Sequence, residues 1–101
     1  LKSEFGVELV IIQCGYFFEV IEEDAELFHR NFNFKLHHCG GCRPYQVTGF
    51  PKREWLLNKY LNILDERKIN YAILEQIDVR DNYVTREVTH SSNSNVLGLV
   101  F

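Results

Sequence analysis

The chain has 101 residues, enough for one small domain with a single hydrophobic core. Hydrophobic residues make up 46% and charged residues 25%, and the net charge of -3 excludes a basic protein that coats nucleic acid by charge alone. The longest apolar run, Leu9–Ile12, is far shorter than the roughly 18 residues of a membrane span. We expect no signal peptide, and because Leu stands at position 1 we expect the natural N-terminus to lie upstream. Three cysteines do not suit a secreted disulfide scaffold, so we expect a reducing, intracellular compartment.

The first third of the chain predicts two strands followed by a helix. Val7–Gln13 is almost entirely apolar, as in a strand buried on both faces, and Tyr16–Ile21 continues as a second strand after a bend at Gly15. Glu22–Phe32 is predicted to be a helix, because its apolar residues form one stripe and its charges suit the helix dipole at each end.

The remainder predicts one more helix and four more strands. Lys52–Lys68 has the clearest helical spacing, with Pro51 at or just before its first turn. His37–Pro51 and His90–Asn95 have the composition of loops. The further strands are expected at Phe34–Cys39, Tyr71–Gln76, Tyr83–Thr89 and Val96–Phe101. This order predicts an α/β or α+β domain, with a mixed sheet of five to six strands flanked by two to three helices.

Phe17 and Glu19 are the first candidates for a binding site. Side chains alternate between the faces of a strand, so if Phe18 and Val20 enter the core, Phe17 and Glu19 stand together on the opposite surface. A flat ring beside a carboxylate suits a planar, hydrogen-bonding ligand such as a nucleobase. The alternative is that Phe17 is a core residue beneath a helix and Glu19 a charge at its rim.

Four blocks of the sequence follow one another along most of the chain. Leu9–Ala25 has an apolar strand, Gln, Gly, Phe, an aromatic residue, Glu and an acidic run ending in Ala. Gly49–Pro51 is a Gly-x-Pro step into the next predicted helix, Tyr71–Gln76 is a predicted strand ending in Glu-Gln, and Arg86–Thr89 is a later strand. In these motifs and in their order, the chain resembles domain I, the mismatch-recognition domain, of the MutS family.

The resemblance implies a DNA-contacting module without enzymatic activity or cofactor of its own, because the family's ATPase lies in other domains. In this family the Phe of Phe-x-Glu wedges into the minor groove and stacks on a mispaired or unpaired base, which the Glu hydrogen-bonds. By position these residues are Phe17 and Glu19. The implied partners are duplex DNA with mismatches or small loops, other MutS domains and repair proteins, with no membrane. The implied location is the cytoplasm, at the nucleoid, and residues 1–101 would form one such domain, as a fragment or a stand-alone relative.

A minor-groove wedge also needs contacts to the phosphates beside it. Arg43, Lys52 and Arg53 are the candidates, and the last two are expected in the first turn of a helix, where free N–H groups suit a phosphate. The alternative is that these are solvated surface cations. Because the net charge is -3, we expect weak binding, in the ~1–100 µM range, that depends strongly on salt.

Two other functions remain open. A Cys-x-x-Cys pair, Cys39 and Cys42, with His37 nearby and Cys14 as a fourth ligand, could bind zinc or act as a redox dithiol. The usual second ligand pair is absent, so a glycine-rich turn with incidental thiols is the simpler explanation, and we expect no metal site. The other function is a protein-interaction or regulatory domain that keeps the MutS fold without binding DNA.

Overall fold

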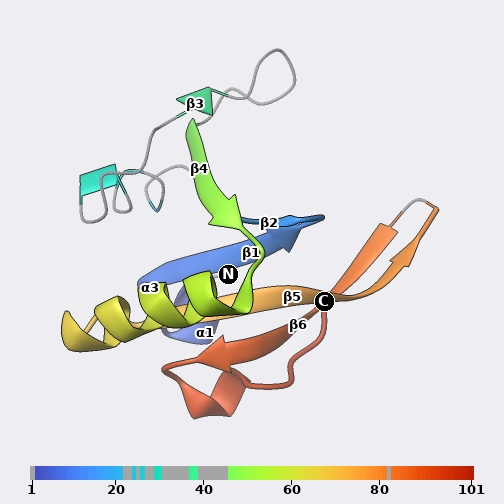
Figure 1. Ribbon diagram of the computed structural model, residues 1–101. Helices are drawn as coiled ribbons and strands as arrows, with labels where there is room; N and C mark the ends of the chain where they lie inside the picture. The colour runs from blue at the N-terminus through green and yellow to red at the C-terminus, as the bar shows by residue number, and fades with distance from the viewer. Residues whose placement is uncertain are drawn as a thin grey trace.

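The computed structural model describes residues 2–21, 24, 26, 29–30, 37–38, 46–81 and 83–101. Its centre is a six-stranded sheet in the order β3-β4-β2-β1-β5-β6, with the helix α3 (Glu54–Glu66) lying across one face (Figure 1). The strands are β1 (Leu9–Cys14), β2 (Phe17–Ile21), β3 (His37–His38), β4 (Gln46–Pro51), β5 (Tyr71–Arg80) and β6 (Tyr83–Ser91). Two shorter helical segments are α1 (Lys2–Phe5) and the 3-10 helix η1 (Ser94–Val96).

The sheet is mixed, which confirms the predicted fold class. β1 runs parallel to β5, from the pair Leu9–Tyr71 to the pair Ile12–Leu74, and the other neighbouring strands pair antiparallel. Parallel neighbours need a crossover connection, and the connection between β1 and β5 contains α3. The crossover places α3 over the middle of the sheet.

The described part of the chain has fewer packed helices than expected, because α3 is the only helix there longer than four residues. Within the helix expected over 22–32, residues 24, 26, 29 and 30 are helical and the others lie outside the described residues. Of the strand expected over 34–39, only residues 37 and 38 are described, and they are extended. No helix in the described ranges is both long and apolar enough to cross a membrane.

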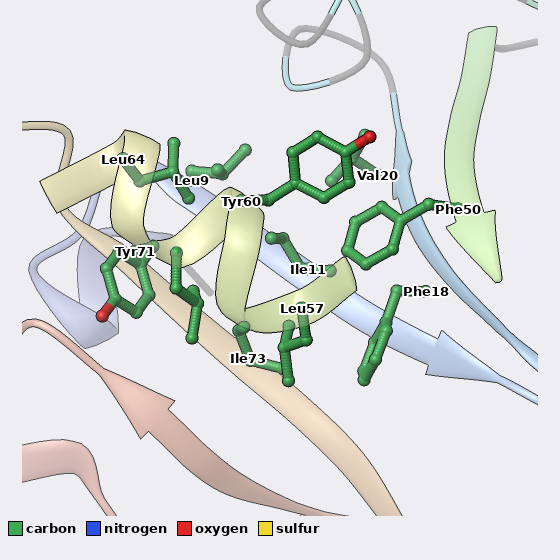
Figure 2. Packing of buried hydrophobic residues seen from close by; sticks show 11 residues of the cluster. Leu9, Ile11, Phe18, Val20, Phe50, Leu57, Tyr60, Leu64, Tyr71 and Ile73 are labelled. Carbon is green, nitrogen blue, oxygen red and sulfur yellow. The ribbon is translucent and has the colours of Figure 1, made fainter. Parts of the chain in front are cut away.

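Buried apolar side chains pack against both faces of the sheet. In α3 the buried residues recur at helical spacing, at Leu57, Tyr60, Leu61 and Leu64, and they pack on side chains of β1, β2, β4 and β5 (Figure 2). The Phe50 ring lies 4.8 Å from the Tyr60 ring, centre to centre. A second cluster lies on the opposite face and consists of Phe5, Val7, Val10, Ala72, Leu74, Val88 and Val96, with Ile12 packed against it. The prediction that the first strand is buried on both faces is therefore confirmed.

The assignment of 46–51 to a loop is wrong, because this segment is the strand β4. It pairs antiparallel with β2, from Phe17–Pro51 to Ile21–Val47. Gly49 permits this pairing, since a Cβ there would collide with the backbone oxygen of Phe18. Gly and Pro, which are typical of loops, here allow a close approach and end a strand.

The strand expected over Val96–Phe101 is also partly wrong. Val96 ends the 3-10 helix, and Gly98 follows with φ 85°. Only then does the chain run along β6, where Arg86 and Phe101 exchange backbone hydrogen bonds of 2.8 and 2.7 Å. The polar residues before Val96 favour a capped turn, because the Asn93 side chain accepts from the backbone N–H of Asn95.

Candidate nucleic-acid interface

Phe17 is the first residue of β2, directly after the turn that joins β1 to β2. The turn consists of Gly15, whose φ of 62° suits glycine, and Tyr16, and it brings Phe17 opposite Cys14. Phe17 is 51% exposed, whereas its neighbour Phe18 is 1% exposed and belongs to the core under α3. The prediction from strand alternation is confirmed, so Phe17 lies on the face of the sheet opposite α3.

Glu19 lies on the same face as Phe17, half-buried between neighbouring strands. It pairs with Ile12 of β1 and with Gly49 of β4. Cys14 is close enough to interact with it: burial raises the pKa of the Cys14 thiol, and the negative charge of Glu19 raises it further. A ring and a carboxylate thus share one surface, as base recognition would require.

Arg86 adds a cation to this surface, although it is not among the site residues predicted from the sequence. From β6 it reaches across to the end of β1, where its Nε donates to the Gln13 carbonyl over 3.0 Å and its guanidinium lies 3.8 Å from the Cys14 sulfur. The same charge lowers the pKa of Cys14 and so opposes the effects of burial and of Glu19. Spacing gives no signal for this residue, because the contact joins positions 73 apart.

Gln13 supports the turn that carries Phe17 from inside the sheet. Its side chain is buried, and its Oε1 accepts from the backbone N–H of Gln76 at 2.8 Å. Its Nε2 donates to the Gly15 carbonyl at 2.9 Å and to the Gln76 side chain at 3.2 Å. From the other side, the backbone N–H of Lys52 donates to the Tyr16 carbonyl at 2.7 Å. The turn is therefore bonded on both sides.

The expected phosphate contacts are only partly placed. Lys52 and Arg53 lie next to the turn, but the prediction that they begin a helix is wrong, since α3 starts at Glu54 and Arg53 is its extended N-cap residue. Arg53 is exposed, whereas the Lys52 ammonium lies 3.5 Å from a carboxylate oxygen of Glu75. Arg43 lies outside the described residues.

Lys52 and Glu75 belong to a polar group on the α3 side of the sheet. Glu75 Oε1 accepts from the Thr89 hydroxyl at 2.7 Å and lies 3.4 Å from Nδ1 of His90. These side chains border a cavity of about 270 Å³ at the start of α3, lined by Phe18, Lys52, Arg53, Glu54, Leu57, Asn58, Glu75 and His90. Glu75 and His90 are not among the site residues predicted from the sequence. The cavity lies on the opposite face of the sheet from Phe17, so it is not part of the same surface.

The proposed zinc ligands fall largely outside what the structure describes. Cys39 and Cys42 are not among the described residues, and His37 is described only as a strand residue pairing with Val47. Cys14 is half-buried on β1. No group of three or more His, Cys, Asp or Glu side chains able to hold a metal occurs among the described positions. The expectation of no metal site therefore stays a prediction, and zinc at these residues stays its alternative.

The sheet and the surface around Phe17 place this chain in a class of mixed α+β domains, and comparison with known families narrows that class. Residues 1–97 match the family model for MutS domain I, and the chain belongs to this family. It is also 30% identical over 90 residues to a relative from Haloarcula marismortui, DNA mismatch repair protein MutS 1. That match covers 88% of this chain, which spans 9% of the relative's length.

Proposed function

We propose that this chain is a DNA-binding module of mismatch-repair type, which recognises mispaired or unpaired bases in duplex DNA. Phe17 wedges into the minor groove and stacks on the base, and Glu19 hydrogen-bonds it. The observation that carries this proposal is the half-exposed Phe17 ring, fixed on the surface opposite α3 beside Glu19, while Phe18 fills the core. Membership of the MutS domain I family supports the same function.

The energetics of insertion favour damaged or mispaired sites. Wedging a ring between base pairs costs a few kcal/mol of unstacking, and bending a duplex costs a further ~1–6 kcal/mol. Stacking on one base returns ~1–3 kcal/mol, so insertion is favoured only where the duplex is already weak. A ring that is held rigidly discriminates best between weak and intact sites in the duplex. The hydrogen bonds from Gln13 and Lys52 to the turn residues restrain the backbone next to Phe17.

Cations around the wedge supply attraction to the phosphates. Arg86 lies on the Phe17 surface, and Arg53 is exposed next to the turn. Lys52 would share its charge between Glu75 and a phosphate, which weakens its contribution. With a net charge of -3, the chain has little general attraction for DNA, so we expect weak binding that falls steeply with salt. Duplex DNA as the partner implies an intracellular location.

Fluorescence anisotropy at low salt tests the proposal. The wild type and Phe17→Ala are titrated with a matched duplex, a G·T duplex and a duplex with a one-base bulge. We expect tighter binding to the bulge and the mismatch, and a loss of that preference in Phe17→Ala by about 5- to 150-fold, the equivalent of ~1–3 kcal/mol of stacking. Trp55→Ala is the matched control, because Trp55 is 65% exposed on α3 and should leave the preference unchanged.

Equal binding to all three duplexes, or a preference that survives Phe17→Ala, would reject the wedge. The second candidate function, a protein-interaction domain contacting other MutS domains or repair proteins, would then be favoured. Its supporting observation is an exposed apolar strip at the end of the chain, formed by Leu97, Leu99, Val100 and Phe101.

A further inference from the structure

The β5–β6 hairpin extends beyond the rest of the sheet as a two-stranded arm. We define the β5–β6 arm as residues 77–80 of β5 and 83–85 of β6, which project from the body of the molecule (Figure 1). Three of its apolar side chains are largely exposed: Ile77 at 52%, Val79 at 65% and Tyr83 at 60%. An exposed strand edge presents unpaired N–H and C=O groups, which are a template for pairing with another strand.

The arm leaves one edge of β5 unpaired among the described residues. β1 pairs with β5 only as far as Leu74, and the backbone N–H of Gln76 then donates to the Gln13 side chain. From Ile77 onward, the described residues place no strand along this edge of β5. The edge begins at an irregularity in the β5–β6 register between Gln76 and Asp78.

The backbone of Val79 points toward this unpaired edge. Arg80 pairs with Tyr83 across a two-residue connection, and the closing pair of such a hairpin is a hydrogen-bonded pair. Because hydrogen-bonded and non-hydrogen-bonded pairs alternate, the next pair, Val79 with Val84, is not hydrogen-bonded. The N–H and C=O of Val79 therefore face away from β6 and can each bond to another chain.

The charges on this edge are complementary to themselves. If two copies of the edge meet antiparallel with Val79 opposite Val79, a two-fold axis places Asp78 of each copy opposite Arg80 of the other. Asp78 and Arg80 already point the same way, since their side chains form an ion pair of 2.9 Å within one strand. On the other face, Val84 and Val79 of both copies would form a row of four valines. Charges that usually block an edge here match across the axis.

We propose that the β5–β6 arm pairs with the same arm of a second copy of this chain, forming a four-stranded antiparallel ribbon centred on Val79. The paired edge is short, so the contact belongs to the weak class that buries less than about 1,200 Å². It is independent of the Phe17 surface and does not rest on the proposed DNA function.

Analytical ultracentrifugation of charge variants tests the pairing. The wild type should sediment faster as its concentration rises to about 0.5 mM, as weak interfaces require. Asp78→Arg places two arginines on each edge and Arg80→Asp places two aspartates there, so each variant alone should remain monomeric. An equimolar mixture of the two should associate again, because every cross-strand pair is then Arg with Asp. Loss of the ion pair within the strand cannot explain this rescue, since both variants lack it.

The same experiment can overturn the proposal. Circular dichroism confirms that each variant is folded; because both substitutions are on an exposed arm, the fold should be retained. A wild type that stays monomeric throughout, or a mixture that stays as monomeric as its components, would reject self-pairing. If instead the wild type is monomeric and the Arg80→Asp variant loses affinity for duplex DNA by anisotropy, the arm is a nucleic-acid contact and the dimer is rejected.

Discussion

Gln13 joins three parts of the molecule through one side-chain amide. It bonds the backbone and the side chain of Gln76 on β5 and the carbonyl of Gly15 in the turn before Phe17. The pairing of β1 with β5 ends at Ile12 and Leu74. Beyond that point, the Gln13 side chain takes the place of the next residue of β1 and accepts from the backbone of β5. A buried amide satisfied in this way fixes where the turn begins.

We predict that Gln13→Ala lowers the free energy of unfolding by about 1–3 kcal/mol, because it leaves the Gln76 N–H unsatisfied and removes the bond to the turn. It should also weaken the preference for bulged DNA, since Phe17 loses part of its support. Urea unfolding and anisotropy measure the two effects. Gln76→Ala is the control: it removes only the side-chain contact and keeps the backbone bond, so its cost should be smaller. Equal costs for the two variants would contradict this account.

Phe17 and Glu19 could be selected from the sequence because strand alternation is a local rule, and β2 obeys it. Arg86 could not, because its role depends on β6 lying two strands away from β1, which is a property of the sheet order. Lys52 was selected for its charge, but the sequence could not show that Glu75 lies 3.5 Å from it. Residues that act through local geometry can thus be predicted from the sequence, and residues that act across the sheet cannot.

At the scale of elements, α3 can be predicted from its local sequence, whereas β4 depends on contacts with another strand. The four buried residues of α3 recur at helical spacing, so the helix is visible in the sequence, although its start at Glu54 is two residues later than expected. β4 is held by pairing with β2 and by the close approach at Gly49, and both depend on another strand. Its Gly and Pro therefore suggest a loop when the sequence is considered alone.

The start of α3 carries Arg53, one of the proposed phosphate contacts. Arg53 occupies the N-cap position but makes no side-chain cap, a position where Ser, Thr, Asp or Asn is preferred. We predict that Arg53→Ser raises the free energy of unfolding by about 0.5–1 kcal/mol through capping, while lowering DNA affinity through loss of a cation. Urea unfolding and anisotropy measure these opposite changes. Arg53→Ala is the control, since it should lower affinity without the gain in stability. A serine variant that binds DNA as well as the wild type would remove Arg53 from the interface.

At the scale of the whole molecule, the two faces of the sheet carry different groups. The α3 face has the cavity with Lys52, Glu75 and His90, whereas the opposite face has Phe17, Glu19, Cys14 and Arg86. The sheet separates these groups, so a small ligand held in the cavity does not contact the Phe17 surface. Both surfaces nevertheless meet at the turn, because the Lys52 backbone bonds to Tyr16. DNA bound at Phe17 would thus lie close to the cations at the start of α3.

The stability of the folded chain should fall in alkaline solution. Burial raises the pKa of Cys14, with the charge of Glu19 adding to the effect, and burial also raises the pKa of Tyr60. Burial and the negative charge of Asp65 raise the pKa of Tyr71. Because the pKa values of all three groups are raised by folding, the folded chain holds these protons more tightly than the unfolded chain does. Their contribution to stability is complete below the unfolded values, about 8.5 for Cys and about 10 for Tyr, and is lost as pH rises through the folded values.

We therefore expect the free energy of unfolding, measured in urea between pH 7.5 and pH 11, to decline in two stages. The first stage belongs to Cys14, and Cys14→Ala should remove it while leaving the second, which belongs to Tyr60 and Tyr71. Glu19→Gln should make the first stage smaller and end it at lower pH, because the carboxylate that raises the pKa of the folded Cys14 thiol is gone while the unfolded pKa is unchanged. A stability that stays constant or rises over this range would show that the folded chain does not hold these protons more tightly. A first stage unmoved by Glu19→Gln would show that Glu19 and Cys14 do not interact on the Phe17 surface.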